Sequence, residues 1–209
     1  MATEVDHLVV ACATLDEGAA WCRATLGAEP VAGGAHEGRG THNLLLGLGP
    51  AYLELIAPDP AQPAPPRPRA FGLDGRAPGA PPGLVTYVAR TDDLGATLLA
   101  ATAWGAAEAM TRGTLAWRIA RPPGEDGMGW VLPHLIEWPD GVSVAARLPD
   151  SGLRLLALSA EHPDADAARA ALASAGLGGV VSVARGGRPR LTARLSRPGG
   201  AGEEVVLGS

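Results

Sequence analysis

Two side chains that can bind a metal ion or transfer a proton lie in short apolar runs typical of β-strands. His7 lies in Val5–Ala11 and Glu54 in Tyr52–Ile56. Residues two positions apart share a strand face, so both side chains share theirs with apolar neighbours. A buried carboxylate is uncommon unless it is paired or bound to a metal. Two interpretations follow: a metal site, or a polar pair hydrogen-bonded to each other or to water.

The elements that must position these residues follow a recurring order. After the His7 strand, Thr14-Leu15-Asp16-Glu17 is a capping box that predicts a helix, and Gly27 predicts its end. Strand-like segments follow near 28–32, 41–48 and 51–57, with a Gly-rich loop at 33–40. The order β-α-β-β-β recurs, with predicted strands at 84–89, 106–112, 114–121 and 130–138 and a helix that begins after Thr91 or Asp92 and ends at Gly105. A fainter copy has a helix at 164–175, ended by Gly176, and strands at 153–160, 180–184, 190–196 and 203–207.

These repeats predict an α+β protein of three modules. Module 1 spans residues 1–57, a Pro-rich connector spans 58–82, module 2 spans 83–149 and a related third module spans 150–209. The prolines of the connector predict a stiff, extended segment that joins no central strand or helix.

Composition excludes several functional classes. The 209 residues carry 17 basic and 22 acidic side chains, and 46% of the residues are hydrophobic. A net charge of -5 without a basic patch argues against a nucleic-acid or anionic-membrane partner. The chain starts directly in a strand, which predicts a cytoplasmic protein without a targeting segment. Cys12 and Cys22 are interpreted as buried reduced thiols.

Several short motifs together resemble the glyoxalase-like branch of the vicinal oxygen chelate superfamily. This superfamily includes glyoxalase I, extradiol dioxygenases, methylmalonyl-CoA epimerase and the fosfomycin- and bleomycin-resistance proteins. The resemblance is specific over residues 5–57, weaker up to Trp138 and only topological beyond it. The motifs are Asp6-His7-Leu8-Val9-Val10, Leu15-Asp16, Leu26-Gly27, Gly33-Gly34-Ala35-His36, Gly40-Thr41-His42-Asn43 and Tyr52-Leu53-Glu54-Leu55-Ile56.

The resemblance implies tandem βαβββ modules whose mixed sheets curl around a cleft. It also implies a divalent metal held by side chains from the first and last strands of each module. His7 and Glu54 fall on the two positions of module 1. In module 2 the first-strand position falls near Leu84, which cannot bind a metal, and the neighbouring Thr86 is a poor substitute.

The last-strand ligand of module 2 has two alternatives. One alignment places Ala145 there, and the other takes 130–138 as the final strand and offers His134. With His134, two imidazoles and a carboxylate would suit Fe(II), Mn(II), Ni(II) or Zn(II). Glu54 would then be a ligand or, if the metal is held poorly, a catalytic base.

Four further residues are candidates for contact with a substrate. His36, His42 and Asn43 lie in or just after the Gly-rich loop, where an exposed, mobile histidine is the plain alternative. Trp117 lies in a predicted strand of module 2 and would line an apolar pocket or pack in the core.

The implied function is that of a metal-dependent lyase, isomerase or dioxygenase acting on a small oxygenated substrate. The alternative is a metal-free protein that binds or sequesters a small molecule, as the bleomycin-resistance proteins do, and the missing ligand near Leu84 favours it. A further alternative follows from the odd number of modules: one module pairs across a homodimer, so that a site or sheet is completed by a second copy.

Overall fold

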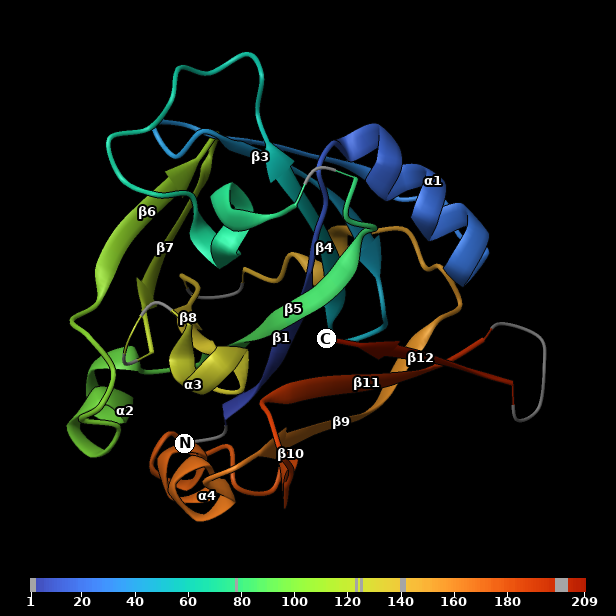
Figure 1. Ribbon diagram of the computed structural model, residues 1–209. Helices are drawn as coiled ribbons and strands as arrows, with labels where there is room; N and C mark the ends of the chain where they lie inside the picture. Colours follow the sequence, from blue (N-terminus) through green and yellow to red (C-terminus); the bar gives the residue numbers. More distant parts are fainter. Residues whose placement is uncertain (1–2, 78, 123, 125, 140–141, 198–202) are drawn as a thin grey trace.

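The structure is a computed structural model of the chain, and it describes residues 3–77, 79–122, 124, 126–139, 142–197 and 203–209. Its elements form one eight-stranded sheet and one four-stranded sheet (Figure 1). No helix in the described part of the chain is long and apolar enough to cross a membrane.

The eight-stranded sheet contains the strands of modules 1 and 2. They are β1 (Thr3–Ala11), β2 (Val31–His36), β3 (Thr41–Gly47), β4 (Tyr52–Pro58), β5 (Gly83–Thr91), β6 (Glu108–Arg112), β7 (Leu115–Ala120) and β8 (His134–Glu137). The second sheet contains β9 (Arg154–His162), β10 (Val181–Arg185), β11 (Arg190–Ser196) and β12 (Glu204–Gly208). The helices are α1 (Leu15–Leu26), α2 (Leu94–Ala100), α3 (Gly127–Trp130) and α4 (Ala165–Ser174), with 3-10 turns η1 (Ala70–Gly75) and η2 (Ala145–Arg147).

The strand order of the large sheet confirms the predicted tandem modules. The order is β2-β3-β4-β1-β5-β8-β7-β6, in which each half places its first strand at the centre beside its own fourth strand. β1 pairs with β4 in parallel and β5 with β8 in parallel, and the antiparallel β1–β5 pair joins the halves. The sheet curls until its edge strands β2 and β6 come into contact, and Arg112 at the end of β6 donates to Asn43 on β3, the strand next to β2.

Local signals placed α1 correctly. Thr14 is its N-cap and accepts a hydrogen bond from the Glu17 amide, and Gly27 ends the helix with a left-handed φ of 69°. The prediction of a helix that extends to Gly105 was wrong: α2 begins after the N-cap Asp93 and ends at Ala100. Trp104 lies beyond it and donates its indole N–H to the carbonyl of Pro133.

Two other strand boundaries differ from prediction. β2 continues to His36 through the predicted Gly-rich loop, with a register shift between Ala32 and Gly34. A Cβ at Gly33 would lie 2.0 Å from Asn43 Oδ1, so only glycine allows β2 to pass the side chain of β3 here. The predicted strand at 130–138 is shorter in the structure, where only β8 (His134–Glu137) is a strand. Pro133, directly before His134, cannot donate a strand hydrogen bond.

The third unit has the predicted element order but a different strand pairing. Its sheet order is β10-β9-β11-β12, with β9 parallel to its second strand β10. In the first two modules the parallel partner of the first strand is the fourth strand. The third unit therefore forms a separate sheet that packs against the large one within the same chain (Figure 1).

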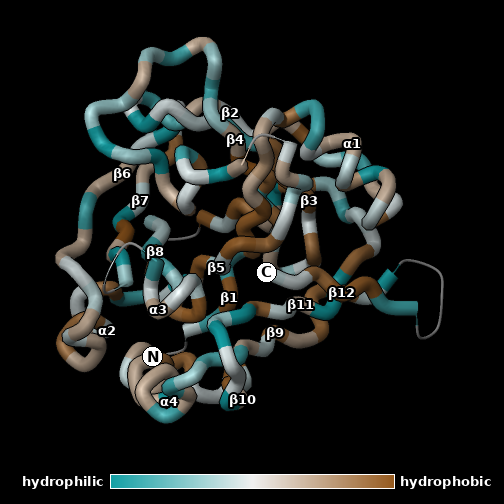
Figure 2. The backbone as a smooth tube through the Cα atoms, in the orientation of Figure 1, coloured by the Kyte–Doolittle hydropathy of each residue, from teal (hydrophilic) through white to brown (hydrophobic). Residues whose placement is uncertain are grey.

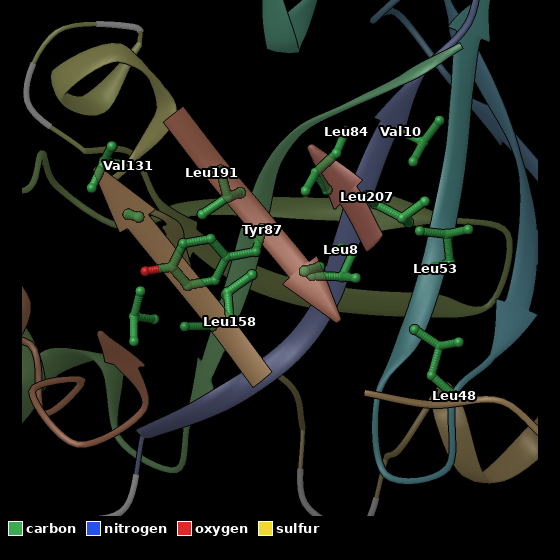
Figure 3. Close-up of a cluster of buried hydrophobic side chains, with 14 of the residues drawn as sticks. Leu8, Val10, Leu48, Leu53, Leu84, Tyr87, Val131, Leu158, Leu191 and Leu207 are labelled. Carbon is green, nitrogen blue, oxygen red and sulfur yellow. The ribbon is translucent and has the colours of Figure 1, made fainter. Parts of the chain in front are cut away.

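The main core lies between the two sheets. Leu8 and Tyr87 pair across β1 and β5 and face the leucines of the small sheet, among them Leu158 and Leu191 (Figure 3). The hydropathy of the residues along the chain agrees with this core, because the hydrophobic segments are concentrated in the central strands (Figure 2). Since β1 is covered on one face by the small sheet, its other face, which carries His7, is available for a site.

Replacing Leu8 with alanine tests this core. Leu8 is fully buried, so L8A should lower the free energy of unfolding by about 2–5 kcal/mol through the lost burial and the cavity left behind. L99A is the matched control, because Leu99 is 83% exposed, and it should change stability by about 0.5 kcal/mol or less. Urea denaturation measures both. Equal effects of the two variants would contradict the packing described here.

Candidate functional site

A cavity of about 620 Å³ lies inside the curl of the large sheet, on the face opposite the small sheet. Strands of both modules contribute to its wall, so it lies across the β1–β5 junction. The candidate residues His7, Glu54, His134, His36 and Trp117 all line it.

His7 is held between two carboxylates. Its Nδ1 lies 2.6 Å from Asp6 Oδ1 and its Nε2 lies 3.5 Å from Glu54 Oε2. Asp6 is adjacent to His7 and would point to the opposite face of a regular strand, but the β1–β5 register shifts between Val5 and His7. Trp138 donates its indole N–H to the other Asp6 oxygen, and the Tyr52 ring stacks on the imidazole at 4.5 Å. The orientation of His7 is therefore fixed on both sides.

The contact between His7 and Glu54 sets the charges of both side chains. Burial opposes a charge on His7, but the hydrogen bonds to Asp6 and Glu54 outweigh it and raise the His7 pKa to about 9. Burial likewise opposes the Glu54 charge, and the interaction with His7 outweighs it and lowers the Glu54 pKa to about 2. Without a metal, the pair is an imidazolium and a carboxylate near neutral pH.

The remaining oxygen of Glu54 faces polar side chains of β2 and β3. Asn43 donates from Nδ2 to Glu54 Oε1 at 2.5 Å, and His36 Nε2 lies 3.8 Å from the same oxygen. Burial lowers the His36 pKa, despite the opposing effect of Glu54, so this imidazole is neutral. Asn43 itself is buried, and its side-chain oxygen Oδ1 accepts a hydrogen bond from Arg112. It positions Glu54 and Arg112 relative to each other.

Module 2 contributes one histidine to the wall, His134 at the start of β8. Its ring packs against Phe71 at 5.0 Å, and burial, with a smaller effect from Arg121, lowers the His134 pKa to about 3. It is therefore neutral, with a lone pair available. β5 places Val88 beside both His7 and His134, so the central strand of module 2 supplies no donor.

Other predicted positions lie elsewhere. Thr86 is fully buried and donates to the carbonyl of Trp130, and Ala145 lies in η2 rather than in a strand. His42 is not brought to the cavity, because it alternates with Thr41 and Asn43 along β3 and so faces away. It lies 3.8 Å from Asp59 instead. The turn at 139–141, on which the Ala145 alignment depended, includes positions outside the described residues.

Sequence reasoning missed the polar rim of the cavity. The connector was predicted as a spacer, but residues 65–71 form part of the wall. Arginines from all three parts of the chain also line it, with Arg39 from module 1, Arg67 and Arg69 from the connector, and Arg112 and Arg121 from module 2. Phe71 and Trp130 adopt left-handed φ values of 61° and 69° beside the cavity, which is unusual for bulky residues. The only sequence signal was the Pro-Arg-Pro-Arg run at 66–69.

The residues match a divalent metal in donor type and, for one pair, in spacing. Two ligands that each lie ~2.1 Å from a tetrahedral ion are separated by ~3.4 Å, close to the 3.5 Å between His7 Nε2 and Glu54 Oε2. A carboxylate behind a ligating histidine, as Asp6 is behind His7, is the usual support at such sites. No group of three or more His, Cys, Asp or Glu side chains among the described residues is already arranged to hold an ion.

Comparison with known proteins identifies the family. Residues 5–176 match the family of glyoxalase-like domains, which is most of the chain. The chain belongs to the glyoxalase-like domain family. This glyoxalase-like chain is thereby a member of the vicinal oxygen chelate superfamily, as its motifs indicated, and members of that superfamily often use divalent metals. No curated protein matches the sequence.

Solved structures resemble the glyoxalase-like chain at low identity. Methylmalonyl-CoA epimerase from Mycobacterium tuberculosis is 26% identical over 65% of this chain and 88% of its own, with a TM-score of 0.46. A hypothetical protein from Staphylococcus aureus is 15% identical over 83% of this chain and 75% of its own (TM-score 0.63). One from Bacillus halodurans C-125 is 13% identical over 68% and 99% (TM-score 0.51). The two hypothetical proteins share the fold.

The His7–Glu54 pair predicts how stability depends on pH in EDTA-treated protein. The folded-state pKa of His7 is about 9 and its ordinary value is 6.5, so the stabilisation is complete below pH 6.5 and is lost as the pH rises to 9. In this window the free energy of unfolding should fall by about 1 kcal/mol per pH unit. Urea denaturation at several pH values measures the slope.

The variant H7Q is the control. It should remove the fall in the free energy of unfolding between pH 6.5 and 9, whatever its stability at any single pH. The Glu54 contribution follows the opposite sign: it is present above pH 4.5 and is lost as the pH falls towards 2. A wild-type stability that stays constant between pH 6.5 and 9 would contradict the buried ion pair.

Proposed function

We propose that this protein is a divalent-metal-dependent lyase, isomerase or dioxygenase that acts on a small oxygenated molecule inside the cavity. One observation carries the proposal: His7 Nε2 and Glu54 Oε2 face the cavity 3.5 Å apart, with the His7 ring fixed from behind by Asp6. Carboxylates and imidazoles together suit Fe, Mn, Ni or Zn.

His7 and Glu54 would hold the ion, and His134 would be the third ligand from the other module. When bound, such an ion polarises a carbonyl oxygen of the substrate. His7 must lose its extra proton to bind, and Asp6 compensates by accepting the hydrogen bond from Nδ1. His134 needs no such step, because burial already keeps it neutral.

The same side chains also provide for proton transfer. His36 is neutral and lies 3.8 Å from Glu54 Oε1, so one of the two can accept a proton from a substrate carbon while Asn43 holds the carboxylate in place. Trp117 and Trp138 pack against each other at 5.2 Å and give the same cavity an apolar part of its wall.

A second candidate function is metal-free binding or sequestration of a small molecule. Two observations favour it: the β5 residue beside His7 and His134 is Val88, which has no donor atom, and no threefold donor cluster is already formed among the described side chains. In this case the His7–Glu54 ion pair is a permanent polar feature of the pocket.

Metal analysis of protein purified without an affinity tag separates the two candidates. Wild type should contain close to one equivalent of Fe, Mn, Ni or Zn, and H7A and E54A should lose it because each removes one member of the closely spaced pair. H134A should weaken metal retention on dialysis about 10-fold or more, the loss of one ligand of three. Elemental analysis by mass spectrometry gives the contents.

H42A is the matched control, since His42 lies on the neighbouring strand β3 but faces away from the cavity. It should retain the metal of the wild type. If wild type stays empty after incubation with each ion, the metal-dependent function fails and the metal-free binding function takes its place. Loss of metal in H42A would show that the ion is bound elsewhere.

A further inference from the structure

The cavity is basic although the chain is acidic. The protein has a net charge of -5, yet five arginines line this one cavity and Glu54 is the one carboxylate among the described residues of its wall. The carboxylate is itself compensated by the His7 imidazolium at 3.5 Å. The positive charge of the arginines is therefore not explained by Glu54.

Carboxylates outside the wall compensate three of the arginines. Glu108 lies 3.3 Å from Arg121 and 3.7 Å from Arg39, and Asp74 pairs with Arg69. Within the described part of the chain no carboxylate lies within ion-pair distance of Arg67 or Arg112. Of these two, Arg67 is exposed, and Arg112 is half-buried with the neutral side chains of Asn43 and His36 as its neighbours.

Arg112 lies nearest to the reactive side chains. Its Nη1 donates to Asn43 Oδ1 at 3.1 Å and lies 3.5 Å from His36 Nε2, and both of these residues contact Glu54. A guanidinium has five N–H donors, and these contacts use a single nitrogen. Arg112 is half-buried and lines the cavity, so the rest of its planar fork remains for a ligand.

Another part of the wall is apolar and begins on β7, the strand paired with the β6 strand of Arg112. Trp117 and Trp138 pack together there, and Ile136 and Val88 belong to the same apolar cluster and also line the cavity. A ligand that fits both parts must have an apolar body and an anionic end. A volume of about 620 Å³ is typical of pockets that bind small organic molecules.

We propose that the substrate or ligand is an amphipathic organic oxyanion whose carboxylate or phosphate group is bound by Arg112 and whose apolar body lies against Trp117 and Trp138. This inference rests on the proposed function, because it names the substrate class of the same site. Arginine binds both oxyanions through two parallel hydrogen bonds, which lysine cannot reproduce. An anion docked there would present its neighbouring atoms to Glu54 and His36.

A purely structural role for Arg112 would predict something different. Its contact with Asn43 also links the edge strand β6 to β3 across the curl of the sheet. A structural role would affect stability and all ligands equally. Only an oxyanion site would discriminate between a charged ligand and its neutral isostere.

The test is isothermal titration of EDTA-treated protein with phenylacetate, phenylacetamide and benzylphosphonate. Wild type should bind at least one of the two anions about tenfold more tightly than the amide, the expected gain from hydrogen bonds to a charged group. The tighter of the two anions identifies the oxyanion. R112Q should bind all three probes equally, and R112K should keep only part of the preference.

R118Q is the matched control, because Arg118 lies on the adjacent strand β7, is half exposed and pairs with Glu137 outside the cavity. It removes the same charge from the chain and should keep the full preference. Thermal melts of each variant check folding, and if R112Q does not fold, R112K decides.

Three results would overturn the proposal: no preference for either anion in wild type, no saturable binding of any probe, or a preference that R112Q and R112K retain in full. Because the titrations use metal-free protein, they are independent of the metal analysis. An empty metal site with an intact anion preference would reject the metal-dependent function and leave this assignment standing. A filled metal site without anion preference would reject this assignment and leave the metal-dependent function standing.

Discussion

The antiparallel pairing of β1 with β5 is the constraint on which the rest of the structure depends. It joins two βαβββ modules into one curled sheet and places a strand with two different faces at its centre. One face carries Leu8 and is buried by the small sheet, and the other carries His7 and opens into the cavity. Core and site are therefore built from alternate residues of the same strand, and both depend on the register of β1 against β5.

The cavity wall carries charges of both signs. Asp6, His7 and Glu54 form a buried chain of contacts on module 1, and five arginines also line the cavity. Burying charges is costly unless each has a partner, and here the partners come from both modules, with Trp138 reaching back to Asp6. Site and fold are thus coupled through the same hydrogen bonds.

Membership in the glyoxalase-like family explains the architecture but leaves the chemistry to individual residues. Val88 on β5, beside His7 and His134, has no donor atom, so the two modules are unequal: module 1 supplies the His7–Glu54 ion pair, and module 2 supplies a neutral imidazole and the apolar part of the wall. This asymmetry suits a bound molecule with distinct ends.

The sequence by itself determined the elements that depend on neighbours in the chain. The capping box at Thr14, the stop at Gly27 and the alternation around His7 and Glu54 are local, so the modules and the faces of both residues could be predicted. Only the tertiary structure decided which long-range partners meet. The bulge at Asp6, the face of His42 relative to the cavity and the meeting of Arg112 with Asn43 depend on strand register and sheet curvature, and residues 69 positions apart carry no periodic signal of their contact.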